Sequence, residues 1–166
     1  NEHRGASLSY AVQDAQLGSG HALLAAREAV DGPFLAVNGD QVVAPEVVAD
    51  VREAFGDDVA DGRPTATLAV VERADVSEYG AVVLDDDRVT ELVEKPGGDR
   101  YSLLNAGVYA FDGGIFDALD STPRVDGELA LTDTLRRLVA AGRVRGVRTR
   151  GSWVDAARPW DLLSVA

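Results

Sequence analysis

Several residue types are absent or rare in this chain of 166 residues. It has no cysteine, which excludes disulfides, thiolate nucleophiles and cysteine-ligated zinc. Only two histidines are present, so any metal must be held by oxygen ligands, which favour Mg²⁺ or a similar hard cation. No apolar run approaches the roughly 20 residues of a membrane-spanning helix, and no signal-peptide pattern opens the chain. These absences predict a cytoplasmic protein without a membrane partner.

Positive charge is also scarce. The chain has 28 acidic and 16 basic residues, a formal net charge of -12 and a pI near 4.4. A nucleic-acid partner is therefore not expected, because nucleic-acid binding requires a basic face. Lys95 is the only lysine. A composition rich in Asp, Ala and Val and poor in Lys resembles that of salt-adapted, halophilic proteins from haloarchaea, in which strong salt screens the repulsion between carboxylates.

A short apolar run over residues 34–37 is followed at once by Asn38-Gly39-Asp40. This pattern is typical of a buried parallel strand that presents a carboxylate at the carboxyl edge of an open α/β sheet, where ligands bind. The alternative is a hairpin, with Asn38-Gly39 as a type I′ turn and residues 41–43 as the returning strand. Pro45 and the helical apolar pattern after it favour the order strand, acidic loop, helix.

Strand and helix patterns alternate along the chain and predict one α/β domain over residues 1–166. We expect a Rossmann-like, mostly parallel sheet flanked by helices, with an antiparallel hairpin over residues 81–93. Thr132 or Asp133 is expected to cap the long helix near the C-terminus, and Gly142 to end it. The predicted strands are 6–12, 34–37, 65–71, 81–84, 89–93, 105–111 and 144–149, and the predicted helices are 22–30, 45–55, 115–119, 132–141 and one beginning at Pro159.

Polar side chains gather in four short stretches. Gln13 and the glycine-rich residues 16–20 offer an amide for a nucleobase edge and a backbone that can approach a flat ring. Glu94-Lys95-Pro96 and Asn105-Ala106-Gly107 offer a carboxylate, an ammonium group and an amide to a sugar phosphate. The remaining two stretches contain Asp40 and Asp155.

Asp40 and Asp155 each close an apolar, strand-like run. If the two strands are parallel in one sheet, their carboxyl ends share an edge and the two carboxylates converge. We therefore expect their nearest oxygens about 4–6 Å apart, a spacing that suits a shared Mg²⁺ ion.

Together these stretches resemble the sugar-1-phosphate nucleotidyltransferases, also called NDP-sugar pyrophosphorylases. Residues 16–22 are most similar to the uridylyltransferases that make UDP-N-acetylglucosamine, whereas Glu94-Lys95-Pro96 and residues 153–163 are more similar to the glucose-1-phosphate thymidylyltransferases. The resemblance implies transfer of a nucleotidyl group from dTTP or UTP to a sugar 1-phosphate, with Mg²⁺ as cofactor and release of an NDP-sugar and pyrophosphate.

The resemblance also implies a role for individual residues. Lys95 would contact the sugar phosphate and act in catalysis with the two aspartates. The implied sites are nucleotide-binding Gln13, Gly18, Ser19, Asn38 and Gly39, sugar-binding Gly80, Glu94 and Asn105, and metal-binding Asp40 and Asp155.

Three departures from the family pattern modify this prediction. The first strand with its glycine-rich phosphate loop and the C-terminal β-helix are not recognised, and Ala156-Ala157 replaces a Val-Gly or Thr-Gly pair. These departures predict an N-terminally truncated unit that releases pyrophosphate slowly on its own. The alternative is a catalytically inactive nucleotide- or sugar-binding remnant or a structural subunit, and a homo-oligomer is compatible with either.

Overall fold

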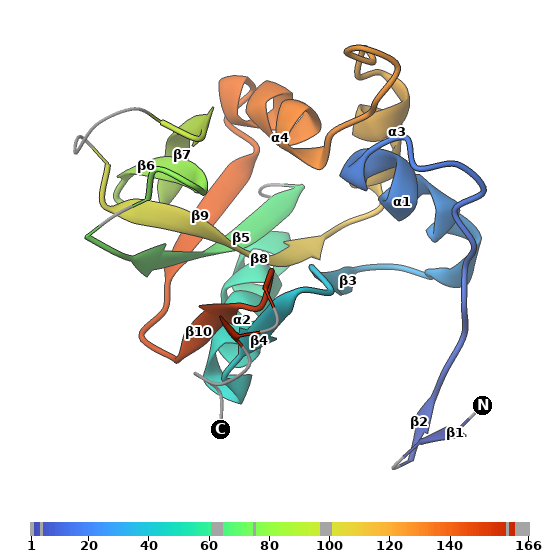
Figure 1. Cartoon of the computed structure of the whole chain (residues 1–166), viewed down its shortest axis with the longest axis horizontal. Coiled ribbons are helices and arrows are strands. Elements are labelled where there is room, and N and C mark those ends of the chain that lie inside the picture. Colours follow the sequence, from blue (N-terminus) through green and yellow to red (C-terminus); the bar gives the residue numbers. More distant parts are fainter. Residues whose placement is uncertain are drawn as a thin grey trace.

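A six-stranded sheet with the order β3-β8-β5-β9-β7-β6 organises the molecule (Figure 1). The computed structural model describes residues 2–3, 5–60, 65–74, 76–96, 101–158 and 160–161. Two further strand pairs, β1–β2 and β10–β4, lie outside the main sheet. The strands are β1 (Glu2–His3), β2 (Ala6–Ser7), β3 (Phe34–Val37), β4 (Gln41–Val43), β5 (Ala66–Glu72), β6 (Gly80–Asp85), β7 (Arg88–Glu94), β8 (Leu103–Phe111), β9 (Val144–Arg148) and β10 (Trp153–Asp155).

Helices cover both faces of the sheet. In Figure 1, α2 lies on one face, and α1, α3 and α4 lie on the other. None of the helices in the described ranges is long and apolar enough to cross a membrane. The helices are α1 (Ser19–Ala25), the 3₁₀ helix η1 (Arg27–Ala29), α2 (Pro45–Ala60), α3 (Gly114–Asp120) and α4 (Leu131–Ala140).

The predicted α/β class, with a sheet between helices, is confirmed, and so is the hairpin, which β6 and β7 form. The strand directions differ from the expected mostly parallel arrangement. Among the described pairings of the main sheet, only β5 and β9 are parallel. β8 runs antiparallel between β3 and β5, which therefore point the same way. An apolar run identifies a buried strand but carries no information about the direction of its neighbour.

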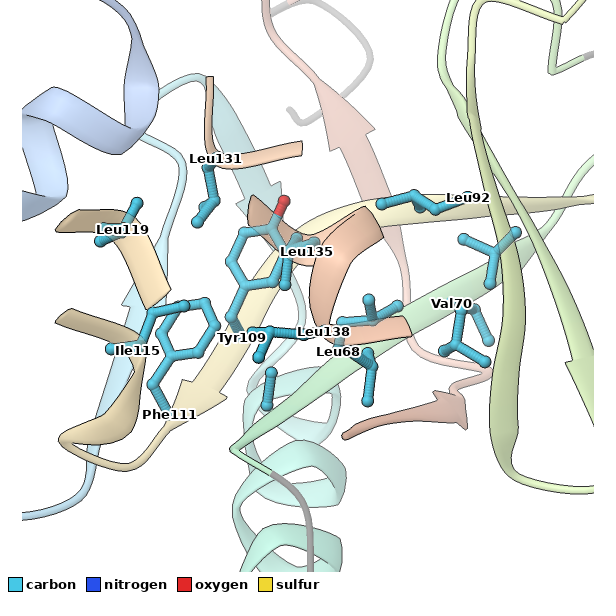
Figure 2. Close-up of a cluster of buried hydrophobic side chains, with 14 of the residues drawn as sticks. Leu68, Val70, Leu92, Tyr109, Phe111, Ile115, Leu119, Leu131, Leu135 and Leu138 are labelled. Atoms are coloured by element: carbon cyan, nitrogen blue, oxygen red, sulfur yellow. The ribbon is translucent and has the colours of Figure 1, made fainter. Parts of the chain in front are cut away.

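The two faces of the sheet bury separate apolar clusters. On β5, Leu68 and Val70 point into the cluster beneath α3 and α4, and Ala69 and Val71 point into the cluster beneath α2. Figure 2 shows Leu135 and Leu138 of α4 against the first of these faces. Burial of one such leucine stabilises the fold by about 1.5–3 kcal/mol. The alternation explains why β5 is apolar at successive positions.

β3 is less buried than the sequence predicts. Leu35 and Val37 are 38% and 46% exposed, whereas Phe34 packs between Phe111 and Phe116 with ring centroids 5.7 and 5.6 Å away. Within the described sheet, β3 is an edge strand that pairs with β8. Gln41–Val43 does form a strand, as in the hairpin alternative, but it pairs with β10 instead of β3.

The helix predicted over residues 22–30 is instead divided into α1 and the 3₁₀ helix η1. Two further predicted elements have clearly different lengths, and one lies outside the described residues. The strand expected over residues 6–12 forms only at Ala6–Ser7, because the segment is exposed and β2 pairs only with the two-residue β1. Helix α2 continues to Ala60 instead of ending near residue 55. The helix expected from Pro159 begins at a residue that the structure does not describe.

The start of α4 is capped from a distant part of the chain. Neither Thr132 nor Asp133 is the N-cap; that position is Ala130, which has no capping side chain. The backbone N–H of Leu131 donates instead to Ser19 Oγ, at 3.0 Å. At the other end, Gly142 adopts φ 68° and ends the helix as predicted. The first residue of α1 is thus bonded directly to the start of α4.

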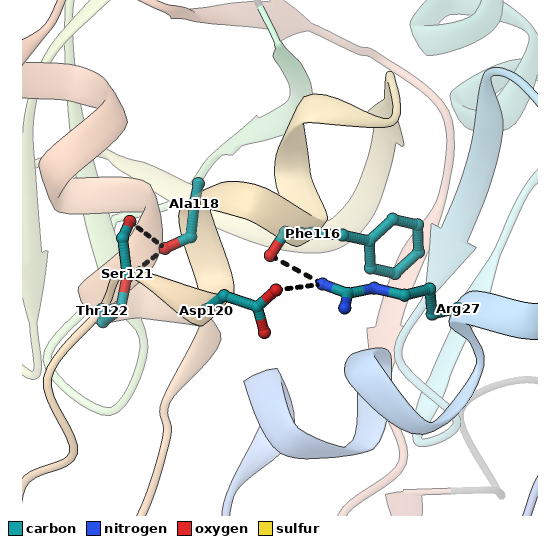
Figure 3. A network of polar contacts seen from close by, with 6 residues as sticks. All are labelled: Arg27, Phe116, Ala118, Asp120, Ser121 and Thr122. Atoms are coloured by element: carbon teal, nitrogen blue, oxygen red, sulfur yellow. Dashed lines mark hydrogen bonds and ion pairs between the residues drawn. The ribbon is translucent and has the colours of Figure 1, made fainter.

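A polar contact ties η1 to α3 (Figure 3). The Arg27 guanidinium donates to Phe116 O at 3.0 Å and pairs with Asp120 at 2.6 Å, while its Cζ lies 5.2 Å from the centre of the Phe116 ring. An exposed ion pair adds little stability, about 0–1 kcal/mol. These contacts instead hold η1, the turn that follows α1, against α3.

Candidate functional site

The Gln13 amide is held by two hydrogen bonds at the entrance to α1. Its Nε2 donates to Gly18 O at 3.1 Å and lies 2.9 Å from His21 Nδ1. Gln13 and His21 are both half-buried, so these bonds are partly shielded from water. The Gln13 side chain therefore bridges the two ends of the loop between Gln13 and His21.

Gly18 and Gly20 permit a close approach between this loop and the backbone of Leu129. Gly18 has φ 97°, and a Cβ atom there would lie 2.5 Å from Leu129 O. A Cβ at Gly20 would lie 2.9 Å from the same oxygen, which accepts the Gly20 N–H at 2.9 Å. In return, Leu129 N donates to Leu17 O at 2.8 Å. Only glycine fits both positions, so the loop requires its two glycines for packing as well as for any contact with a ligand.

Asp40 and Asp155 come together, although not through parallel strands of one sheet. β10 pairs antiparallel with β4 and places Asp155 opposite Gln41, while Ala156 N donates to Asp40 O at 2.8 Å. Gln41 Nε2 then donates to Asp40 Oδ1 at 3.2 Å and to Asp155 Oδ1 at 3.3 Å. The two carboxylate oxygens are thus no farther apart than the sum of these two distances.

The pKa of the Asp155 carboxyl group is shifted mainly by burial and secondly by the proximity of Asp40. Burial raises the pKa of its carboxyl group, the charge of Asp40 raises the pKa further, and the hydrogen bond from Gln41 lowers it. Asp155 also contributes, after burial, to the raised pKa of the Tyr79 hydroxyl. The pair therefore carries unfavourable negative charge that a cation would neutralise.

The donor set fits a hard cation. Two carboxylates leave most of an octahedral shell to water and phosphate, which is how Mg²⁺ is usually held. Gln41 Oε1 is buried near them and has no hydrogen-bond partner among the described residues. In the same described ranges, no group of three or more His, Cys, Asp or Glu side chains is placed to hold a metal. The two carboxylates lie close together as predicted, and their role as Mg²⁺ ligands remains a prediction.

The Asn105 side-chain amide is oriented by hydrogen bonds at both its nitrogen and its oxygen. Its Nδ2 donates to the Tyr109 hydroxyl at 2.8 Å, and its Oδ1 accepts the Gly107 N–H at 3.2 Å. Burial raises the pKa of Tyr109 to about 12, and the charges of Glu94 and Asp40 act in the same direction, whereas the Asn105 bond lowers it. Tyr109 therefore stays protonated, and its hydroxyl accepts a hydrogen bond from the predicted sugar-binding amide.

Asn38 and Gly39 form the turn between β3 and the acidic pair. Asn38 N donates to Gly107 O at 2.9 Å, and a Cβ at Gly107, where φ is 70°, would lie 2.7 Å from Asn38 Nδ2. Gly39 is exposed, with open space around its Cα. The turn thus lies beside Gly107, whose N–H donates to Asn105 Oδ1.

Gly80, Glu94 and Asn105 lie close together, and their role in sugar binding remains a prediction. Gly80 is opposite Glu94 in the β6–β7 hairpin, and a Cβ on Gly80 would lie 3.8 Å from both a Glu94 carboxylate oxygen and Asn105 Cβ. Lys95 follows directly with φ 43°, and its backbone N donates to Tyr79 O at 3.0 Å. The lysine is exposed, and this bond places its backbone next to Tyr79.

A depression of about 720 Å³ lies beside Tyr79 and Asp155, and its described lining includes neither Asp40 nor the predicted sugar-binding residues. Tyr79 packs edge-on against Trp153 with ring centroids 5.4 Å apart, and Trp153 Nε1 donates to Ala106 O at 2.8 Å. The lining residues are Arg73, Ala74, Glu78, Tyr79, Trp153, Val154 and Asp155.

Sequence reasoning missed three polar groups. It selected none of His21, Gln41 and Tyr109 as site residues. Gln41 follows Asp40 directly, which is a signal that the sequence did contain. The contacts of His21 with Gln13 and of Tyr109 with Asn105 depend on the folded shape of the loop and of β8, so the sequence spacing alone does not predict them.

The fold is that of known nucleotide-sugar enzymes. The structure superposes on a UDP-glucose pyrophosphorylase from Acinetobacter baumannii with a TM-score of 0.82, covering 98% of this chain and 60% of that one at 22% identity. This likeness concerns the fold alone.

Sequence comparison gives the family. The chain is 37% identical over 148 residues to the bifunctional protein GlmU of Methanocaldococcus jannaschii, covering 88% of this chain and 34% of that protein. It is 33% identical over 165 residues to a glucose-1-phosphate thymidylyltransferase of Streptomyces griseus, covering 97% of this chain and 45% of that protein. Residues 1–166 match the sequence profile described as nucleotidyl transferase, and the chain belongs to that family. The resemblance to sugar-1-phosphate nucleotidyltransferases is confirmed, and the chain spans between a third and a half of the length of these two relatives.

Proposed function

We propose that this chain carries nucleotide-binding, metal-binding and sugar-binding residues of a sugar-1-phosphate nucleotidyltransferase site. The full reaction transfers a nucleotidyl group from UTP or dTTP to a sugar 1-phosphate and releases pyrophosphate. The observation that carries the proposal is the convergence of Asp40 and Asp155, both bonded to Gln41. The nearby cluster of Gly80, Glu94 and Asn105 supports the sugar phosphate as the second substrate.

Each group of residues has a distinct task in this proposal. Asp40 and Asp155 hold Mg²⁺, which when bound neutralises and positions phosphate oxygens. Gln13, Gly18 and Ser19 with the turn at Asn38-Gly39 bind the nucleotide. Glu94 accepts hydrogen bonds from sugar hydroxyls, and the Asn105 amide can donate or accept them. Gly80 lies between the two and has no side chain, which leaves space for the sugar ring. Lys95 contacts the sugar phosphate. Catalysis of this kind depends on positioning and charge, which suits a chain without cysteine.

A binding experiment tests the metal assignment. The chain is titrated calorimetrically with UTP and with dTTP, with and without Mg²⁺, as wild type, Asp40→Asn and Asp155→Asn. We expect Mg²⁺ to strengthen nucleotide binding to the wild type and each substitution to weaken the Mg²⁺-dependent part at least about tenfold, the effect of losing about 1.4 kcal/mol.

Asp86→Asn is the matched control. Asp86 lies in the exposed β6–β7 turn with φ 55°, a conformation that asparagine also adopts, so the substitution removes one charge without strain. The control should bind like the wild type. Equal binding by Asp40→Asn, Asp155→Asn and Asp86→Asn would remove the metal role from the acidic pair.

A further inference from the structure

Both hydrogens of the Gln13 amide nitrogen are engaged within the protein. One points to Gly18 O at 3.1 Å and the other to His21 Nδ1 at 2.9 Å. A primary amide nitrogen has only two hydrogens. The carbonyl Oε1 is consequently the atom of this amide that is left to meet a ligand.

The orientation of the amide follows from its neighbours. If the amide were rotated by half a turn, Oε1 would face Gly18 O, and two acceptors would oppose each other. The amide nitrogen donates to His21 Nδ1, so this ring nitrogen must be an acceptor. The ring is then neutral, with its proton on Nε2.

The backbone that carries His21 is itself held in place. His21 lies in the first turn of α1, and its backbone N donates to Leu129 O at 3.3 Å. The adjacent Gly20 is buried against the same residue, so the backbone that carries His21 has little freedom to move. The imidazole acceptor is therefore presented to Gln13 by a fixed element.

We propose that His21 is a positioning residue that makes Gln13 an acceptor-only reader of the nucleobase. The proposal rests on the function proposed above and deepens it. An acceptor at this position binds a ring N–H, which uracil and thymine present at N3. Cytosine has an unprotonated N3 at that place, so an acceptor would oppose an acceptor. His21 thereby favours UTP and dTTP over CTP without touching the base.

The first test examines the hydrogen bond itself. Long-range ¹H–¹⁵N correlation spectra of the imidazole in the full chain should show His21 neutral with its proton on Nε2. The side-chain amide signals of Gln13 should shift in His21→Ala. A proton on His21 Nδ1, or Gln13 signals that do not respond to His21→Ala, would overturn the proposal.

The second test measures base selection. Affinities for UTP and for CTP are compared in the wild type, His21→Ala and His21→Asn, all with Mg²⁺. We expect His21→Ala to reduce the UTP preference about tenfold, because one oriented hydrogen bond is worth about 1 kcal/mol. His21→Asn should retain the preference within about threefold, since its Oδ1 is as many bonds from Cβ as Nδ1 and also accepts.

A double substitution separates positioning from a general structural role. If His21 acts through Gln13, then His21→Ala should not reduce the UTP preference further in a Gln13→Ala background. An equal loss in both backgrounds would overturn the proposal. If the wild type bound neither UTP nor CTP, the function proposed above would fail for this chain, and the imidazole spectra would still decide whether His21 holds Gln13.

Discussion

The Gln13 loop and the acidic pair are held in place in opposite ways. The loop is fixed by neutral hydrogen bonds and by two glycines packed against Leu129. It also faces the apolar cluster under α3 and α4, into which Leu23 of α1 packs. The acidic pair is anchored to the other cluster through Trp153, and two like charges are brought together with one amide between them.

The difference indicates which part of the site is complete before a ligand arrives. The loop has its bonds satisfied in the protein alone, so binding there costs little reorganisation. The acidic pair is under electrostatic strain, which a bound cation would relieve. The first region should therefore tolerate substitution poorly in terms of stability, and the second should gain stability when a charge is removed.

The largest effect is expected at Gly18. Gly18→Ala places a Cβ 2.5 Å from Leu129 O in a backbone conformation, with φ 97°, that side chains rarely adopt. We expect a loss of about 3 kcal/mol in the free energy of unfolding, measured by urea denaturation with circular dichroism. Gly113→Ala is the control, because nothing lies within 4 Å of its added Cβ and its φ is -60°. It should change stability by less than about 1 kcal/mol; similar losses for both would refute the packing account.

A smaller loss is expected at Ser19. Ser19→Ala removes the acceptor of the Leu131 N–H at the start of α4, which should cost about 1 kcal/mol, as loss of a helix cap does. Thr132→Ala, the capping residue predicted from sequence, removes a hydroxyl from the same turn without breaking that bond. The same denaturation experiment compares them, and a larger loss for Thr132→Ala would contradict the long-range cap.

At the acidic pair, a substitution should increase the free energy of unfolding instead of lowering it. Because the folded-state pKa of Asp155 is raised, its ionisation is costlier in the folded protein, and stability falls as the pH rises from the ordinary value of 3.8 through the raised value. Without metal, Asp155→Asn should therefore be more stable than the wild type at pH 7, by up to about 1 kcal/mol, since the group is partly exposed. The gain should vanish at pH 3. Denaturation curves at both pH values check this, and a destabilised variant at pH 7 would argue against repulsion.

The smallest effect concerns Gln41. Gln41→Leu removes the hydrogen bond that lowers the Asp155 pKa, so the pKa should rise further. A pH titration of the carboxyl ¹³C signal measures it in both proteins. An unchanged or lower pKa would mean that Gln41 does not bridge the pair.

Local patterns in the sequence were sufficient to locate most of the helices and the strands of the main sheet. The apolar periodicity of α4, the Gly142 stop and the β6–β7 hairpin are properties of short segments, and all three are confirmed. The direction of β8 and the pairing of β10 with β4 depend on contacts between distant segments. No local pattern contains that information.

The same distinction holds for the site. Asp40 and Asp155 were predicted to converge because each ends an apolar run, and they do so through an antiparallel pairing that was not predicted. Groups that act on another side chain, such as His21 on Gln13, carry no motif of their own. They are found only when hydrogen-bond donors and acceptors are counted in the folded structure.

The surroundings of Trp153 give the protein an optical reporter of its own. The chain has two tryptophans: Trp153 is 5% exposed and lies two residues from Asp155, whereas Trp160 is 61% exposed. Trp153 should emit at shorter wavelength and resist acrylamide quenching, while Trp160 should emit at longer wavelength and be quenched. In Trp160→Phe, the fluorescence would come from the indole between Tyr79 and the acidic pair. Occupation of the acidic pair could then be followed by light emission, without labels.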